Sequence, residues 1–478
     1  MSIQPIFCRN TPGSFDFLPT EIQCQILEQL SGLKSLLALI YASPRYFQVY
    51  RAFKAPILSG IIRNTVPPDL LGIAVDAHEQ REKYRGDKRR DPAAILAYVN
   101  DYFLEQKLPP LATSGTLPLE TSIRLLRFHE IVEYFISEFA IDRFALINAK
   151  LISSKKSDAD MPVVLSSVEH FRLARAFYHI ELFGQLFFTA SETSENNAAV
   201  SNQAEPFLQH LRDFELEELL CVRSYLIDKL IVYLRQMEDE FVHEYMEQEL
   251  YRVEPRYAYS RWENDDRFFS IDGRRDLQNW MEDCLTIGLG ALKAIFTANT
   301  MDERFYNLRH TFSPQGIWPA ALNRLPRIVR PLIRSQNQKV FVQDGFDRGN
   351  SGWFRLLSNG HHPRESSNYA DAVQGPRRCG YAIWDYDRMI SLGLLTERTW
   401  DQMGSALRRR NVPGTSYRQS VEGRISDQVK RLKADGRLSL DSPRSRQLEY
   451  PTIGKRRDWE SVDGDFYEYI AFHIQRES

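Results

Sequence analysis

The chain has 478 residues, a length that predicts about three domain-sized units. Its hydrophobic share of 43% is that of an ordinary globular protein and excludes disorder over most of the chain. A net charge of -2 does not favour binding of nucleic acid or of an anionic membrane surface by the chain as a whole.

Cysteine usage and the start of the chain both indicate an intracellular protein. The five cysteines are widely spaced and form no Cys-x-x-Cys pair, so the sequence indicates neither a disulfide framework nor a zinc site. This usage fits a reducing compartment. Residues 1–8 lack the basic start and apolar run of a signal peptide, and the longest apolar run, Leu285 to Ala298, is too short to span a bilayer. We therefore expect a cytoplasmic or nuclear protein without a membrane partner.

Residues 15–50 predict three short amphipathic helices in quick succession. Pro19 suits the start of the first helix, because its missing N–H would have no partner there. Ser31-Gly32 ends this helix, and Ser43 is the expected N-cap of the third, with Pro44 just inside it. The apolar faces of the first two helices are formed by Ile22, Ile26, Leu27, Leu30, Leu33, Leu36, Leu37 and Ile40.

Three helices this short carry more aliphatic surface than they can bury among themselves. A unit below about 50 residues is marginal alone and usually depends on a partner or a neighbouring domain. The excess apolar surface therefore indicates a docking module. In the alternative interpretation, residues 15–58 are simply the first helices of a larger α domain, since leucine-rich amphipathic helices are common.

The combination of Leu18-Pro19 with Glu21-Ile22, two aliphatic stripes and a serine-capped third helix resembles an F-box over residues 15–58. In that family the three helices dock on the Skp-type adaptor of a cullin ubiquitin ligase. The family often carries tryptophan in the third helix, where this chain has Tyr46-Phe47. The resemblance implies that the docking face, or its supporting core, is formed by Leu18, Pro19, Ile22, Ile26, Leu27, Leu30, Leu36 and Leu37.

We predict a mainly α protein that is divided into four parts. An F-box-like module spans residues 14–58, and a helical domain built as a bundle or irregular stack follows at 59–334. A small, glycine-rich α+β cap is expected at 335–407 and a tail at 408–478. The longer helices expected in the helical domain span 91–103, 118–152, 168–188, 215–251 and 273–298. The sequence shows no internal repeat, so the repeat-type substrate-binding modules attached to many F-boxes are not indicated.

The predicted cap contains two strand candidates, Lys339–Val342 and Gly380–Trp384. The second continues into Asp385 as a Gly-Tyr-x-x-Trp-Asp segment. Such a segment after a long helical region is similar to one in F-box proteins of filamentous fungi. Tyr381 and Trp384 have two interpretations, as core residues of the cap or as part of a recognition pocket, and the sequence does not separate them.

The last part of the chain is basic and weakly apolar. Residues 408–457 carry fourteen Lys or Arg against five Asp or Glu, a net charge of +9. This composition predicts a largely flexible tail, which is followed by an aromatic terminal segment. A solvated linker is the simplest interpretation. One alternative is nuclear import or nucleic-acid contacts by Arg408-Arg409-Arg410 and Lys455-Arg456-Arg457. The other is phosphate binding by Arg377-Arg378.

The sequence contains no motif of comparable specificity for catalysis, a cofactor or a metal. His243 lacks the second histidine that a zinc-protease helix needs, and the glycines of residues 345–352 do not have the spacing of a phosphate loop. We therefore expect a non-enzymatic substrate receptor that needs no cofactor. It would link an unidentified protein target to a Skp-type adaptor and, through it, to a cullin. A non-ligase F-box scaffold and a helical nucleic-acid-binding protein that uses the basic tail are the alternatives.

Overall fold

The computed structural model describes residues 17–83, 91–105, 117–151, 164–187, 204–251, 281, 284–300, 303–304, 349–350, 352–353, 375–394 and 417–435. In these ranges the chain is helical, with short turns and no strand, so the prediction of a mainly α protein is confirmed. None of the helices in these ranges is both long enough and apolar enough to cross a bilayer.

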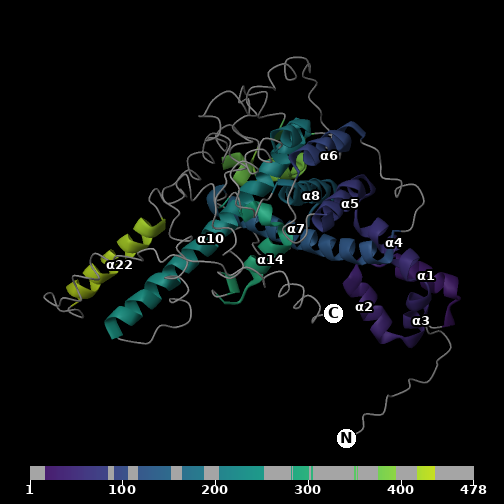
Figure 1. The fold of residues 1–478 in the computed structure, drawn as a ribbon, viewed down its shortest axis with the longest axis horizontal. Coiled ribbons are helices and arrows are strands. Elements are labelled where there is room, and N and C mark those ends of the chain that lie inside the picture. Colours follow the sequence, from purple (N-terminus) through teal and green to yellow (C-terminus); the bar gives the residue numbers. More distant parts are fainter. Residues whose placement is uncertain are drawn as a thin grey trace, which may run out of the picture.

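The principal helices, in chain order, are α1 (Thr20–Glu28), α2 (Leu33–Ala42), α3 (Pro44–Ala52), α4 (Lys54–Thr65), α5 (Pro68–Lys83), α6 (Pro92–Glu105), α7 (Leu119–Leu151), α8 (Ser167–Phe187), α10 (Asp213–Tyr251), η3 (Leu285–Ile287), α14 (Leu289–Thr297), α20 (Tyr386–Ser391) and α22 (Tyr417–Ala434). Figure 1 shows α1–α3 at one end of the molecule. The outer part of α10 projects at the opposite end, where α22 accompanies it.

The first three helices begin and end close to where the sequence predicts. Pro19 is the N-cap of α1, one position before the helix, and the amide of Ile22 donates to its carbonyl at 3.0 Å. Gly32, with a φ of 149°, lies between α1 and α2. Ser43 caps α3 as predicted, because its hydroxyl accepts a hydrogen bond from the Tyr46 amide at 3.3 Å.

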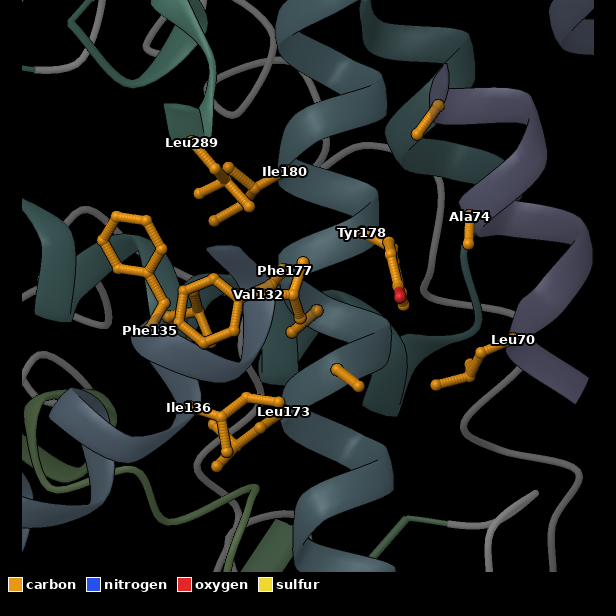
Figure 2. Packing of buried hydrophobic residues seen from close by; sticks show 14 of the residues in the cluster. Leu70, Ala74, Val132, Phe135, Ile136, Leu173, Phe177, Tyr178, Ile180 and Leu289 are labelled. Atoms are coloured by element: carbon orange, nitrogen blue, oxygen red, sulfur yellow. The ribbon is translucent and has the colours of Figure 1, made fainter. Parts of the chain in front are cut away.

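α8 is the central helix of the described body, and nearly all of its side chains are buried. It packs against α5, α7 and α10. Figure 2 shows Tyr178 directed toward Leu70 and Ala74 of α5, whereas Phe177 points toward α7. There the Phe177 ring centroid lies 5.5 Å from that of Phe135. A helix that is buried on every side must place its charged residues beside partners, because unpaired buried charges are strongly unfavourable.

The prediction of a single helix over residues 273–298 is wrong in the part that the structure describes. Gly288 separates η3 from α14 and has a φ of +93°, a region that favours glycine. The break lets the Leu289 amide, the first of α14, donate to the buried Glu181 carboxylate at 2.6 Å. Gly184 of α8 permits the close approach of η3, since a Cβ there would lie 2.9 Å from the Thr286 carbonyl oxygen. The apolar run therefore turns at α8 instead of continuing as one helix.

The prediction of an α+β cap is also wrong in the described residues, which contain no strand. Residues 380–384 form a turn, not a strand, between a short helical stretch at 375–378 and α20. Gly380 has a φ of +73°, and the Ile383 amide donates to the Gly380 carbonyl at 2.9 Å. Hydrogen bonds are thus made locally and not to a neighbouring strand. The other strand candidate, 339–342, lies outside the described residues.

An 18-residue helix, α22, lies within the tail for which the composition predicts flexibility. It packs along α10, and its Val429 side chain is fully buried. The sequence signal for this helix is the spacing of four apolar residues, Val421, Ile425, Val429 and Leu432. The high charge of the segment conceals this periodicity when composition alone is considered. Residues 408–416 and 436–478 lie outside the described ranges.

Candidate functional site

The helices α1–α3 and the residues that flank them bury one group of apolar side chains and expose another. The buried group consists of Leu27, Leu36, Ile40, Tyr46 and Val49. The exposed group, here called the exposed apolar set, consists of Phe17, Ile22, Leu37, Tyr41, Phe47 and Phe53. These six are half of the twelve exposed large hydrophobic residues in the described ranges, yet all come from residues 17–53. This concentration within one small unit makes the unit a candidate interaction surface.

The structure divides the eight predicted docking residues by their exposure. The exposed ones are Pro19, Ile22 and Leu37. The half-buried ones are Leu18, Ile26 and Leu30. The buried ones are Leu27 and Leu36. The buried pair therefore supports the helical unit from within, and the three exposed residues are available to a partner.

Tyr41 is the most exposed member of the exposed apolar set, at 82%, and the resemblance does not include it among the docking positions. It lies four residues after Leu37, so the two side chains share one side of α2. α2 packs against α3, on which Phe47 is exposed. Helical spacing could have identified Tyr41, since Leu37 and Tyr41 each lie one residue after the buried Leu36 and Ile40.

The unit formed by α1–α3 is attached to the body through α4. Asn64 Nδ2 of α4 donates to the Glu28 carbonyl of α1 at 2.6 Å, and α1 packs directly against α4. α4 also packs against α7, and the Leu117 amide just before α7 donates to Ser59 Oγ at 3.2 Å. A partner bound to α1–α3 would therefore be held in a defined orientation relative to the body.

A second candidate site is the segment Gly375–Leu394, here called the clasp segment, which contains the Gly-Tyr-x-x-Trp-Asp motif. Trp384 is fully buried against Phe139 and Phe144 of α7, at ring-centroid distances of 5.7 and 5.2 Å. Its indole Nε1 donates to the Cys379 carbonyl at 2.7 Å. Tyr381 is buried as well. The burial of both rings favours the core interpretation of these aromatics over a recognition pocket.

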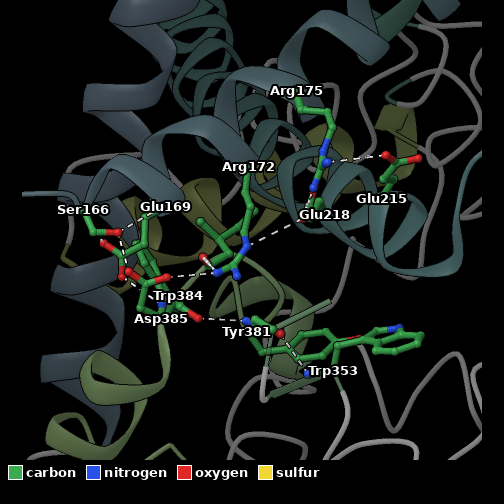
Figure 3. A network of polar contacts seen from close by, with 12 residues as sticks. Ser166, Glu169, Arg172, Arg175, Glu215, Glu218, Trp353, Tyr381, Trp384 and Asp385 are labelled. Atoms are coloured by element: carbon green, nitrogen blue, oxygen red, sulfur yellow. Dashed lines mark hydrogen bonds and ion pairs between the residues drawn. The ribbon is translucent and has the colours of Figure 1, made fainter. Parts of the chain in front are cut away.

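Arg172 of α8 connects the clasp segment to α10, as Figure 3 shows. Its Nη1 donates to the Ile383 carbonyl at 3.0 Å and to Asp385 Oδ1 at 3.1 Å. Glu218 of α10 lies 4.0 Å from Arg172 Nε and accepts two hydrogen bonds from Arg175, at 3.0 and 2.8 Å. Burial raises the pKa of Glu218 to about 7, although both arginines oppose the shift.

Glu169 and Ser166 bind the clasp segment at the start of α8. The Glu169 carboxylate accepts from the Asp385 amide at 3.0 Å and from Arg388 Nε at 2.6 Å. The same carboxylate accepts from the Ser166 amide, and Ser166 Oγ accepts from the Glu169 amide, at 3.0 and 3.1 Å. This reciprocal pair is a capping box, which a Ser-x-x-Glu pattern can reveal in a sequence. The Ser166 hydroxyl also donates to Asp385, so the helix start and the clasp segment stabilise each other.

The two adjacent arginines of the clasp segment form ion pairs with α10. Arg377 donates two hydrogen bonds to Glu217, of 2.8 and 2.6 Å, and the Tyr381 hydroxyl donates to the same carboxylate at 2.9 Å. Arg378 lies 2.9 and 2.7 Å from the two carboxylate oxygens of Asp228. Guanidinium groups engaged in this way are already matched to carboxylates, so the structure does not favour phosphate binding by Arg377-Arg378.

Other polar clusters give no stronger candidate. In the described ranges, no group of three or more His, Cys, Asp or Glu residues is placed to hold a metal ion. A cavity of about 250 Å³ is lined by His78, Glu79, Glu82, Glu120, Thr121 and Arg124. Two of its three carboxylates, Glu82 and Glu120, pair with Arg124, which compensates much of their charge. His243 is exposed on α10.

No family model, curated protein or solved structure matches this chain. Its function is therefore inferred from the exposed apolar set and the clasp segment. The clasp segment is paired with helices of its own chain, whereas the exposed apolar set lies in solvent. The exposed apolar set is for this reason the stronger candidate for a binding site.

Proposed function

We propose that this protein is an F-box substrate receptor that links a target protein to a Skp-cullin-type ubiquitin ligase. The observation that carries the proposal is the exposed apolar set, which lies on helices whose sequence resembles an F-box. The chain supplies binding and orientation in this proposal. Catalysis belongs to the other subunits of the ligase.

The exposed apolar set can supply part of the free energy of adaptor binding. Full burial of one large apolar side chain contributes about 1.5–3 kcal/mol. Ile22, Leu37 and Tyr41 are between 40% and 82% exposed, so their burial in an interface supplies several kcal/mol before the cost of association. Interfaces depend on a few such anchors, among which aromatic residues are enriched. We therefore expect Tyr41 and Leu37 to be the principal anchors.

The described body supports the proposal as a scaffold for a target. α4 connects α1–α3 to α7, and the clasp segment joins α7, α8 and α10 through Trp384, Arg172 and Glu169. A body joined in this way keeps its shape when the adaptor binds one end. Such a receptor can hold a target at a fixed distance from the site of ubiquitin transfer.

Co-purification of the full-length chain with a recombinant Skp-type adaptor tests the proposal. The wild-type chain should bind at micromolar concentration. Ile22→Asp and the double change Leu18→Ala with Pro19→Ala should each weaken binding at least about tenfold, because they alter predicted docking residues. Ile141→Asp, on an exposed residue of α7, is the control and should bind normally. Failure of the folded wild-type chain to bind the adaptor would refute the proposal.

Addition of a cullin to the purified complex distinguishes a ligase receptor from a scaffold that acts outside ligases. A ligase receptor predicts a ternary assembly that ubiquitinates a bound target. An adaptor complex that excludes the cullin would instead support the scaffold alternative.

A further inference from the structure

Residues 236–251 of α10, here called its outer half, extend away from the body and are strongly acidic. α10 has 39 residues, so it is about 60 Å long. Its first part is buried in the body through Leu219, Leu226 and Leu230, whereas its last part projects beyond the helices of the body (Figure 1). Residues 236–251 of α10 include six Asp or Glu and no Lys or Arg. A projecting helix of one charge sign attracts a partner of the opposite sign.

α22 lies along this outer half and has the complementary charge. Residues 417–434 include five Lys or Arg and two Asp or Glu. Arg424 of α22 forms an ion pair with Asp239 of α10. Val429 is fully buried at 0% exposure, and Leu432 is half-buried against the core. The contact therefore combines an apolar anchor with opposite charges, which is how amphipathic helices bind grooves and helix faces.

The described side chains of α22 are less buried than those of the clasp segment. Asp427, Gln428 and Lys430 are exposed, and Val429 is the one fully buried side chain among those described in α22. The Arg424 and Asp239 side chains are 39% and 60% exposed, so solvent screens their ion pair. Among the described side chains of α22, one fully buried residue and screened charges hold the helix, so a competitor of the same character can displace it.

We propose that the acidic outer half of α10 is a docking surface for a basic amphipathic helix of a partner protein, and that α22 occupies this surface until the partner displaces it. The surface lies at the opposite end of the molecule from α1–α3 (Figure 1), so the inference does not depend on adaptor binding. The basic tail is, in this view, an intramolecular competitor and not a nucleic-acid contact.

A labelled peptide of residues 415–436 serves as the probe, and the full-length chain is the receptor. Val429→Asp in the chain should release α22, because it places a charge at the buried anchor. The peptide should then bind the Val429→Asp chain at least about tenfold more tightly than wild type, in which the tethered helix competes at high local concentration. Gln428→Asp adds the same charge at an exposed neighbouring position and should behave as wild type.

Reversing the charge at position 239 tests whether the peptide binds to α10. Asp239→Lys, combined with Val429→Asp, should weaken peptide binding, and a peptide with Arg424→Glu should recover it on that chain. Equal binding to the wild-type and Val429→Asp chains, no binding to either, or indifference to the charge at position 239 would each overturn the proposal. Binding of a duplex DNA oligonucleotide by the Val429→Asp chain without peptide binding would overturn it in favour of a nucleic-acid role for α22.

Discussion

Glu28 of α1 and Gly60 of α4 lie in direct contact: a Cβ added to Gly60 would fall 2.7 Å from the Glu28 Cβ and 3.2 Å from its Cα. Helices approach this closely only where one of them lacks a side chain. The contact joins the unit that carries the exposed apolar set to the helix that packs against α7. It is therefore the position at which the attachment of α1–α3 can be tested by a single substitution.

Gly60→Leu should lower the free energy of unfolding by about 1–3 kcal/mol, because the new side chain must displace α1. Urea unfolding of the full-length chain measures this change. Gly423→Leu is the matched control, since a Cβ at that position meets nothing within 4 Å. Equal losses in the two variants would show that the close contact between α1 and α4 does not limit the side chain at position 60.

Asp385→Ala should destabilise the protein by about 3 kcal/mol, because it removes a carboxylate partner from the fully buried Arg172 guanidinium. Thermal and urea unfolding both report the loss. Asp387→Ala, two residues later on an exposed side chain, should change stability by less than about 0.5 kcal/mol. A small effect at position 385 would mean that the clasp segment does not hold the body together.

Gly288→Ala should cost about 2–3 kcal/mol, because its φ of 93° and ψ of 154° belong to a region that is nearly restricted to glycine. The added Cβ would also lie 3.2 Å from a Glu181 carboxylate oxygen. Gly393→Ala provides the comparison, at a φ of +66° with open space around it, and should cost about 1 kcal/mol. Comparable losses in unfolding free energy would argue that the turn between η3 and α14 adjusts freely.

The raised pKa of Asp76 should make the free energy of unfolding fall as pH rises. Burial, with a contribution from the Glu79 carboxylate, raises the pKa of Asp76 to about 7. The folded chain thus keeps a proton that the unfolded chain releases near pH 4, so this contribution to stability is lost as pH rises from about 4 to about 7. Asp76→Asn should therefore be more stable than wild type by about 1–3 kcal/mol at pH 8 and show little difference at pH 4.

Urea unfolding of the two chains at pH 4, 6 and 8 measures this difference. Glu218, whose pKa is also raised to about 7 by burial, remains in both chains and cancels from the comparison. A stability difference between the chains that stays constant with pH would show that Asp76 ionises normally in the folded protein.

The local order of α1–α3 could be predicted from the sequence because each of its signals acts over a few residues. Ser43 caps α3 through the Tyr46 amide, three residues away. Leu27 and Leu36 belong to apolar helix faces that the helical spacing of hydrophobic residues identifies. The resemblance also indicates the exposed Ile22 and Leu37, whereas Tyr41 lies outside the resemblance and is indicated only by its helical spacing from Leu37.

The clasp segment could not be predicted, because its partners are distant in sequence. Asp385 meets Arg172 across 213 residues and Glu169 across 216 residues. Charged residues on a helix normally face solvent, so Arg172 and Glu169 give no local sign of burial. Gly380–Trp384 forms a turn where the sequence predicts a strand, because a short apolar run is equally consistent with a strand and with a buried turn.

The dissociation constant between this chain and a Skp-type adaptor is the most direct test of the central claim. Isothermal titration with three folded proteins, wild type, Tyr41→Asp and Val232→Asp, gives the comparison; Val232 is 47% exposed on α10 and serves as the control. We expect micromolar or tighter binding by wild type and Val232→Asp, and a loss of at least about tenfold for Tyr41→Asp. Absence of wild-type binding, or equal affinity of all three proteins, would contradict the claim.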